Sequence, residues 1–129
     1  MKKSAVKGRT TRPWGAYTVI KVGKGYKVKL VEVSPGKRLS LQRHKYRSEH
    51  WTVVSGIGRI TRGDKTFILK HDQGTFIPKN TLHRLENTQR TTKLRVIEVQ
   101  CGDYTGEDDI QRFDDDFGRI SAGARSKKK

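Results

Sequence analysis

Four polar side chains lie at spacings that suit a metal site. Gln42 and His44 are two residues apart, so on a β-strand their side chains point to the same face. Glu49 follows the polar stretch 45–48, and a hairpin there would return its carboxylate beside the first strand. His83 comes after a proline and a turn, where another strand would begin. We expect the four residues to surround one divalent metal, and such nitrogen and oxygen ligands suit zinc, manganese, iron, nickel or cobalt without choosing among them.

Each of these residues also has an ordinary structural explanation. An isolated His44 would be a surface histidine of a strand, and an isolated Glu49 would be a solvated carboxylate in a turn. The prediction of a metal site therefore depends on their joint placement. His50 could replace Gln42 as a ligand only if the hairpin register differs, because it points away from Glu49 on a regular strand.

The elements that must position these residues are strands. Short apolar runs separated by glycine and proline are typical of strands rather than helices. The predicted strands are 16–22, 26–33, 38–44, 50–61, 66–70, 74–77 and 94–100, and the predicted turns are 34–36, 62–65 and 79–81. Turns about 8–12 residues apart indicate an all-β sandwich or barrel. In 106–119, Ile110, Phe113 and Phe117 are spaced as on a short helix that would cap the barrel.

The length of 129 residues suits one domain, which we place at residues 12–119 between basic tails at 1–11 and 120–129. Only 32% of the residues are hydrophobic, so the core must be economical, as in a barrel whose strands each give one face to the interior. The single cysteine, Cys101, excludes an internal disulfide and fits a reducing compartment. Because no apolar run reaches the roughly 20 residues that cross a bilayer, and no secretory signal opens the chain, we expect a cytoplasmic protein without a membrane partner.

The net charge of +16 is concentrated at the two ends. Residues 1–12 and 119–129 carry ten basic residues, and the body between them carries 19 basic and 13 acidic residues. We expect the tails to be flexible and to aid solubility or weak contact with polyanions. Functional nucleic-acid binding is not expected, because no aromatic and basic motif of a known binding module is present. The positive body favours an anionic substrate such as a phosphosugar.

Six motifs occur in order between residues 12 and 119. They are Arg12-Pro13-Trp14-Gly15, Leu39-Ser40-Leu41-Gln42 with His44, Glu49-His50-Trp51, His83-Arg84-Leu85-Glu86-Asn87, Val96-Ile97-Glu98-Val99-Gln100, and Gly106-Glu107-Asp108-Asp109-Ile110 with Arg112-Phe113. Glu49 also lies seven residues before Gly56, as in the first cupin motif, and the segment that ends at His83 is similar to the Gly-Pro-His-Asn motif. Together they resemble the cupin domain of the type II mannose-6-phosphate isomerase family.

The resemblance implies a cupin fold, which is a double-stranded β-helix or jelly-roll barrel, and a metal-dependent isomerase that interconverts mannose 6-phosphate and fructose 6-phosphate. Other phosphomannose isomerases use a Gln, His, Glu and His ligand set, which the four predicted ligands would reproduce. The reaction also needs cations for the phosphate or the enediolate, and the candidates are Arg112, Lys79 and Arg84. Arg84 would face away from the metal on a regular strand. His50, Lys79 and a hydroxide held by the metal are all candidates for the general base.

The chain departs from the family at one position near the metal. The family typically has His-x-His where this chain has His44-Lys45-Tyr46, and tyrosine is a poorer metal ligand than imidazole. One alternative function is therefore a non-catalytic cupin that binds a sugar or a sugar nucleotide. Another is an inert barrel whose basic tails dock on a polyanion.

The resemblance also bears on partners. In the family this domain commonly follows a mannose-1-phosphate guanylyltransferase domain. This chain has no nucleotide-binding glycine loop, so we expect only the isomerase half of that activity. Cupins often pair through edge strands, and the resemblance therefore implies a homodimer.

Overall fold

The computed structural model describes residues 8–120, and this part of the chain forms eleven β-strands and no helix. In chain order the strands are β1 (Arg9–Arg12), β2 (Gly15–Gly23), β3 (Tyr26–Val33), β4 (Leu41–Arg43), β5 (Ser48–Ser55), β6 (Gly58–Arg62), β7 (Lys65–Leu69), β8 (Gly74–Ile77), β9 (His83–Glu86), β10 (Leu94–Cys101) and β11 (Gln111–Asp114). Within residues 8–120 there is thus no helix that could span a membrane.

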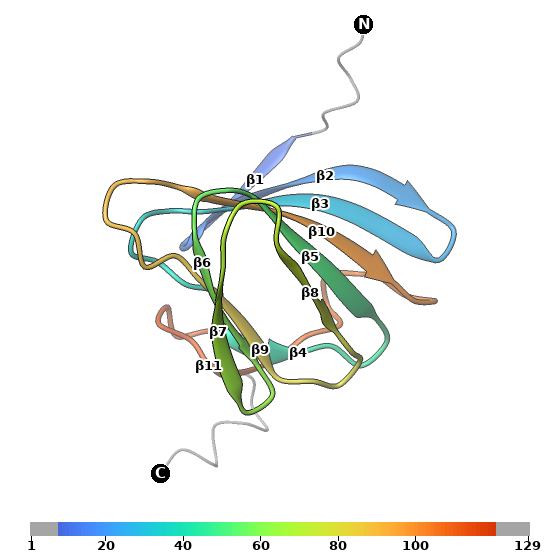
Figure 1. Cartoon of the computed structure of the whole chain (residues 1–129). Helices are drawn as coiled ribbons and strands as arrows, with labels where there is room; N and C mark the ends of the chain where they lie inside the picture. The colour runs from blue at the N-terminus through green and yellow to red at the C-terminus, as the bar shows by residue number, and fades with distance from the viewer. Residues whose placement is uncertain (1–7, 121–129) are drawn as a thin grey trace, which may run out of the picture.

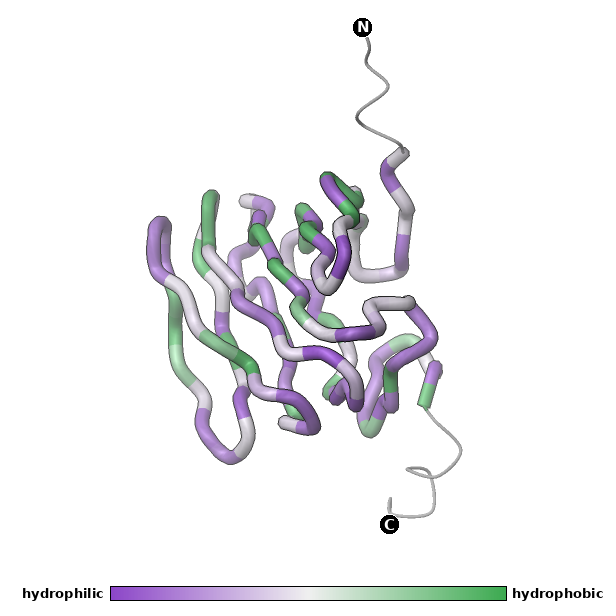
Figure 2. Tube along the Cα trace, turned by 90° about the vertical axis from the view of Figure 1, so that its right-hand side faces the viewer, coloured by the Kyte–Doolittle hydropathy of each residue, from purple (hydrophilic) through white to green (hydrophobic). Residues whose placement is uncertain are grey.

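Two antiparallel sheets face each other around a common interior (Figure 1). One sheet has six strands in the order β1-β2-β3-β10-β5-β8, and the other has five in the order β11-β4-β9-β6-β7. Hydrophilic and hydrophobic residues alternate along many of the strands (Figure 2), as expected for sheets with one buried face. The prediction of an all-β barrel is confirmed.

The interior of the barrel changes from apolar at one end to polar at the other. Successive rows across β3, β10 and β5 are Val31-Val96-Val53, then Lys29-Glu98-Trp51, then Lys27-Gln100-Glu49. All nine side chains are buried. The apolar end joins a hydrophobic cluster that includes Trp14, Ile60, Ile77, Leu85 and Leu94. The polar end of the interior contains a cavity in which charged side chains can contact a ligand.

Most of the predicted strands are present, but the run 50–61 is divided into β5 and β6. The chain turns at Gly56, where φ is +89° and a Cβ would lie 2.6 Å from the carbonyl oxygen of Lys93. Glycine is the residue that this backbone conformation and close approach require. The turn predicted at 62–65 is confirmed as a two-residue hairpin loop, because Arg62 pairs with Lys65.

The segment 42–49 is not the hairpin that the sequence predicted. β4 belongs to the five-stranded sheet and β5 to the six-stranded sheet, so the chain crosses between sheets after β4. Gln42 pairs with His83 of β9, and Glu49 pairs with Gln100 of β10. The prediction was wrong because side-chain alternation does not reveal which strand is the neighbour. The two sheets line one interior, so the crossing still brings the predicted ligands to the same region.

The short helix predicted within 106–119 is also absent. Part of this segment forms β11, which pairs with β4 and places Arg112 opposite Gln42. Three spaced apolar residues give only a weak helical preference, and the free edge of β4 offers backbone hydrogen bonds that the helix would forgo. β11 therefore extends the five-stranded sheet.

Part of the expected N-terminal tail belongs to the barrel. β1 contains residues 9–11 and pairs with β2, so the sheet begins before the predicted domain boundary at residue 12. The rest of the two predicted tails, apart from residues 8 and 120, lies outside the described residues.

Candidate metal centre

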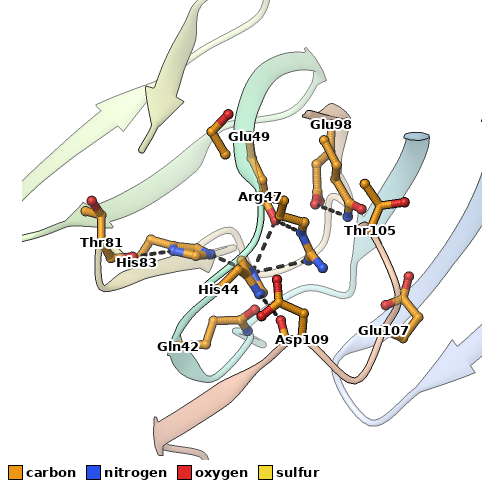
Figure 3. A network of polar contacts seen from close by, with 12 residues as sticks. Gln42, His44, Arg47, Glu49, Thr81, His83, Glu98, Thr105, Glu107 and Asp109 are labelled. Carbon is orange, nitrogen blue, oxygen red and sulfur yellow. Dashed lines mark hydrogen bonds and ion pairs between the residues drawn. The ribbon is translucent and has the colours of Figure 1, made fainter. Parts of the chain in front are cut away.

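Three of the four predicted ligands meet at the polar end of the barrel. The Nε2 atom of His44 lies 3.1 Å from Oε2 of Glu49 and 3.2 Å from Nε2 of His83. Their candidate ligand atoms all lie within 4.8 Å of one another, and all three residues are buried. Figure 3 shows them converging from different parts of the barrel. The cluster is thus built from the residue that follows β4, the start of β5 and, far away in the sequence, the start of β9.

Backbone carbonyls fix both imidazole rings. The Nδ1 atom of His44 lies 2.7 Å from the carbonyl oxygen of Asp109, and Nδ1 of His83 lies 2.8 Å from that of Thr81. A carbonyl can only accept a hydrogen bond, so each Nδ1 carries the proton. In a neutral ring, Nε2 then offers its lone pair to the cluster. Hydrogen bonds of this kind orient histidine ligands in metal sites.

The electrostatics keep His44 and Glu49 in the forms that bind a cation. Burial lowers the pKa of His44 to about 3, and the charges of Arg47 and His83 add to this effect. Burial opposes ionisation of Glu49, but His83, Arg47 and a 2.7 Å hydrogen bond from Trp51 hold the pKa of its carboxyl below the ordinary value. At neutral pH the cluster therefore offers a neutral imidazole and a carboxylate.

This donor set fits a divalent metal. Nε2 of His44 lies 3.1 Å from a carboxylate oxygen of Glu49 and 3.2 Å from Nε2 of His83, and a cation among these three acceptors would be attracted to all of them. Two histidines and one carboxylate form a common three-residue ligand set, which leaves coordination positions for substrate or water.

Gln42, the fourth predicted ligand, lies beside the cluster. It is buried and lines the same cavity as Glu49 and His83. Its Nε2 atom donates a 2.8 Å hydrogen bond to Oγ of Ser40, which leaves its amide oxygen as the atom suited to a metal. Its role as a ligand stays a prediction.

Arg47 was missed by the sequence analysis, although it lies in the centre of the cluster. Its Nε donates a 2.9 Å hydrogen bond to Oε2 of Glu49, and its Nη2 lies 3.2 Å from Nε2 of His44. The arginine is only 5% exposed. The alternation Arg47, Glu49, Trp51 along one face was the signal that could have found it.

The three predicted catalytic cations differ in where their side chains lie relative to the cavity. Lys79 is exposed and does not line the cavity. Arg84 is buried and does line it, but its guanidinium is bound to the carbonyl oxygens of Leu39 and Asp114 and to the Asp114 carboxylate. Arg84 therefore holds β11 against the barrel. Arg112, carried by β11, lines the cavity.

Two further residues considered in the sequence analysis, His50 and Tyr46, lie outside the cavity. His50 is exposed on the outer surface, where its ring contacts Phe76 at 4.7 Å between centroids, so it faces neither the cluster nor the cavity. Tyr46 is 49% exposed and also lies outside this cavity. Replacement of the family's second histidine by Tyr46 therefore leaves the cluster of His44, Glu49 and His83 intact.

The cavity beside the cluster is small and strongly basic. It has a volume of about 120 Å³. Its basic lining residues are Arg12, Lys29, Arg47, Arg84, Arg112 and Arg119, and its acidic ones are Glu49, Glu98 and Glu107. Burial and the nearby charges of Arg119 and Arg12 lower the pKa of Arg112. Like charges gathered in this way favour an anionic ligand.

Glu98 is a second functional candidate that the sequence analysis did not single out. Its side chain is buried on the inner face of β10, and Nε2 of Gln100 donates a 2.8 Å hydrogen bond to it. Burial and the charge of Glu49 raise the pKa of Glu98 to about 7. A carboxyl group of this kind in a cavity is suited to proton transfer.

Comparison with known proteins settles the family. The profile of the family described as mannose-6-phosphate isomerase C-terminal matches residues 1–115. The chain belongs to this family. It is 52% identical over 108 residues to the xanthan biosynthesis protein XanB of Xanthomonas campestris pv. campestris (strain B100), covering 84% of the chain and 23% of XanB. It is 50% identical over 113 residues to the alginate biosynthesis protein AlgA of Pseudomonas aeruginosa, covering 88% of the chain and 23% of AlgA.

The family assignment and the fold agree. The chain spans less than a quarter of the length of these two relatives. Among solved structures, an uncharacterised double-stranded β-helix protein of Klebsiella pneumoniae matches with a TM-score of 0.64 and 18% identity, covering 74% of this chain and 80% of that protein. At this identity the match concerns the fold alone, which is the cupin fold predicted from the motifs.

Proposed function

We propose that this domain is a metal-dependent isomerase that interconverts mannose 6-phosphate and fructose 6-phosphate. The observation that carries the proposal is the convergence of His44, Glu49 and His83 beside a basic cavity. Membership of the family supports the choice of reaction. The metal cluster and the charge of the cavity match the two ends of a phosphosugar, one reactive and one anionic.

The size of the cavity suggests how the substrate lies. A volume of about 120 Å³ is below the roughly 300–1,000 Å³ of sites that enclose a whole ligand. We therefore place only carbons 1 and 2 beside the cluster, with the phosphate on carbon 6 nearer the solvent. Arg12 and Arg112 would hold that phosphate, because guanidinium groups bind phosphate through paired hydrogen bonds. Arg119, whose Nε and Nη2 donate to Asp115, would add positive charge.

Isomerisation moves a proton between carbons 1 and 2 through an enediol. A divalent metal bound by His44, Glu49, His83 and Gln42 would supply a Lewis acid that polarises the sugar oxygens. Arg47 donates to Glu49 in the same cluster, and its fixed positive charge would stabilise negative charge on those oxygens as the proton leaves.

Glu98 is the carboxylate placed to move the proton. Of the three acidic residues that line the cavity, Glu49 belongs to the metal cluster and Glu107 is paired with Lys27 and Lys29. Glu98 remains, with its orientation set by Gln100. It would accept the proton from one carbon and return it to the next.

The test is turnover of mannose 6-phosphate by the purified chain. Protein treated with a chelator should lose production of fructose 6-phosphate, and one of the five candidate metals should restore it. Calorimetry on the same samples would show whether the sugar phosphate binds. Binding without turnover at full metal occupancy would contradict the proposal and favour a non-catalytic sugar-binding cupin.

A further inference from the structure

A second hollow lies on the outside of the barrel, next to the cavity lined by Glu49 and His83, which we call the metal cavity. Its volume is about 480 Å³, within the range of small-molecule sites. We name it the outer groove and define it by Arg43, Lys45, Tyr46, Asn80, Tyr104, Asp108 and Asp109. None of these seven residues lines the metal cavity, although Ile110 lines both hollows.

Two tyrosines form an aromatic corner in the outer groove. Tyr46 and Tyr104 are 49% and 46% exposed, and their ring centroids lie 6.3 Å apart with planes at 88°. The edge of one ring therefore points toward the face of the other. The C–H groups of a pyranose ring carry partial positive charge and are attracted to the negative face of an aromatic ring. A flat nucleobase is held best between parallel rings, which this corner does not provide.

The corner is held in place by hydrogen bonds. The carboxylate of Asp109 accepts hydrogen bonds of 2.9 Å from the backbone N–H groups of Lys45 and Tyr46. The hydroxyl of Tyr104 donates to Asp108, and the backbone N–H of Asn80 donates to the carbonyl of His44 at 2.8 Å. The walls of the groove are thus joined before any ligand arrives, which lowers the entropic cost of binding.

The charge of the outer groove distinguishes it from the metal cavity. Its lining holds two basic residues, Arg43 and Lys45, and two acidic ones, Asp108 and Asp109. The metal cavity holds twice as many basic residues as acidic ones. The balanced groove favours an uncharged ligand over a phosphate. Within residues 8–120, no hydrogen bond engages the side-chain amide of Asn80, so this exposed group can meet a sugar hydroxyl.

We propose that the outer groove binds a pyranose ring of an unphosphorylated saccharide. The sugar face lies on one tyrosine, and its hydroxyls meet Asn80 and the charged groups of the rim. This site is distinct from the isomerase site. It concerns a glycoside that has neither a phosphate nor a free carbonyl group, so the proposal does not depend on isomerase activity.

The test is an amide NMR titration of the full chain with methyl α-D-mannopyranoside. We expect concentration-dependent shifts at the groove residues that do not line the metal cavity, which are Arg43, Lys45, Tyr46, Asn80, Tyr104, Asp108, Asp109 and Gln111. Tyr104→Ala and Tyr46→Ala should each weaken binding at least about tenfold. Phe76→Ala is the matched control, because Phe76 is an aromatic residue that is 43% exposed on β8, and it should leave the affinity unchanged.

Spectra of the free variants establish that each remains folded before its affinity is compared. Absence of shifts in the groove would overturn the proposal, as would binding that survives both tyrosine substitutions. Shifts confined to residues of the metal cavity would also overturn it. So would tighter binding of adenosine than of the glycoside, because the groove would then prefer a flat base.

Discussion

The Nε2 atoms of His44 and His83 face each other across 3.2 Å, while the Nδ1 atom of each ring is held by a backbone carbonyl. The two rings come from residues 39 positions apart, on segments that are joined because Gln42 pairs with His83. Glu49 reaches the same point from the opposite sheet. The barrel thus brings together three candidate metal ligands, and its backbone carbonyls orient the two imidazole rings.

Replacing one imidazole should remove the metal. His83→Asn deletes an Nε2 ligand, so the variant should bind no metal at a concentration that saturates the wild type. A metal at 100 times its Kd stabilises the folded state by about 2.7 kcal/mol. This stabilisation raises the unfolding midpoint of the wild type, and the rise should be absent in the variant. His50→Asn is the matched control, because His50 lies exposed on the outer surface. A variant at position 83 that keeps full occupancy would exclude this residue as a ligand.

Arg47→Gln should separate metal binding from turnover. Removing a positive charge beside the cluster should tighten metal binding, because like charges repel. Turnover should fall by about 10²–10³-fold, as when another enzyme loses a group that stabilises an oxyanion. Metal titration and kcat measured with saturating metal would test both effects.

The control for this variant is Arg59→Gln, which alters an exposed arginine on β6. The Arg59→Gln variant should change neither the affinity for metal nor kcat. An Arg47→Gln protein with unchanged kcat would show that Arg47 only neutralises Glu49.

Arg112→Gln should weaken recognition of the phosphate. A hydrogen bond to a charged group contributes about 1.5–3 kcal/mol, so KM for mannose 6-phosphate should rise at least about tenfold, with a smaller change in kcat. Inorganic phosphate should compete with the substrate for the wild type and much less for the variant. Equal inhibition of the two proteins would place the phosphate elsewhere.

Much of the fold was predictable, because it follows from local alternation and turn residues. The hairpin loop at 62–65 and the strand beginning at Tyr26 are of this kind. The neighbours of β4 were not predictable in the same way. Whether β4 pairs with β5 or with β9 is decided by the packing of two whole sheets, and the short run Leu41–Arg43 carries no local sign of its partner.

The candidate site was also predictable only in part. His44, Glu49 and His83 were found because their residue types and the order of the motifs indicate metal ligands. Glu98 was harder to find, because a carboxylate in a strand is ordinarily exposed, and its importance follows from its burial beside Glu49. Lys79, another candidate, is exposed and does not line the cavity, and a sequence does not fix the direction of a side chain on a turn.

Glu107 should stabilise the segment that follows β10. Its carboxylate accepts hydrogen bonds of 3.1 Å from the buried ammonium groups of Lys27 and Lys29. Glu107→Gln should lower the free energy of unfolding at pH 7 by about 1–2 kcal/mol, a value reduced because the carboxylate is partly exposed. Urea denaturation of metal-free protein would measure this loss. Asp64→Asn, in the exposed turn after β6, is the control and should change stability little.

The contribution of Glu107 should also depend on pH. Burial opposes ionisation, but Lys29 and Lys27 lower the pKa of Glu107 below its ordinary value of 4.5. The folded state therefore releases this proton more readily than the unfolded state does. Its contribution is present above about pH 4.5 and is lost as the pH falls through the lower folded-state pKa. The wild type should lose more stability than Glu107→Gln between pH 5 and pH 3, and identical slopes would contradict the assignment.

The proposed isomerase activity is tested most sharply by titrating metal into metal-free protein while measuring bound metal and turnover of mannose 6-phosphate in the same samples. Turnover should rise in proportion to bound metal and stop rising at one metal per chain, and His83→Asn should remain inactive throughout. Full occupancy of the wild type without production of fructose 6-phosphate, or undiminished turnover without metal, would rule out a metal-dependent isomerase.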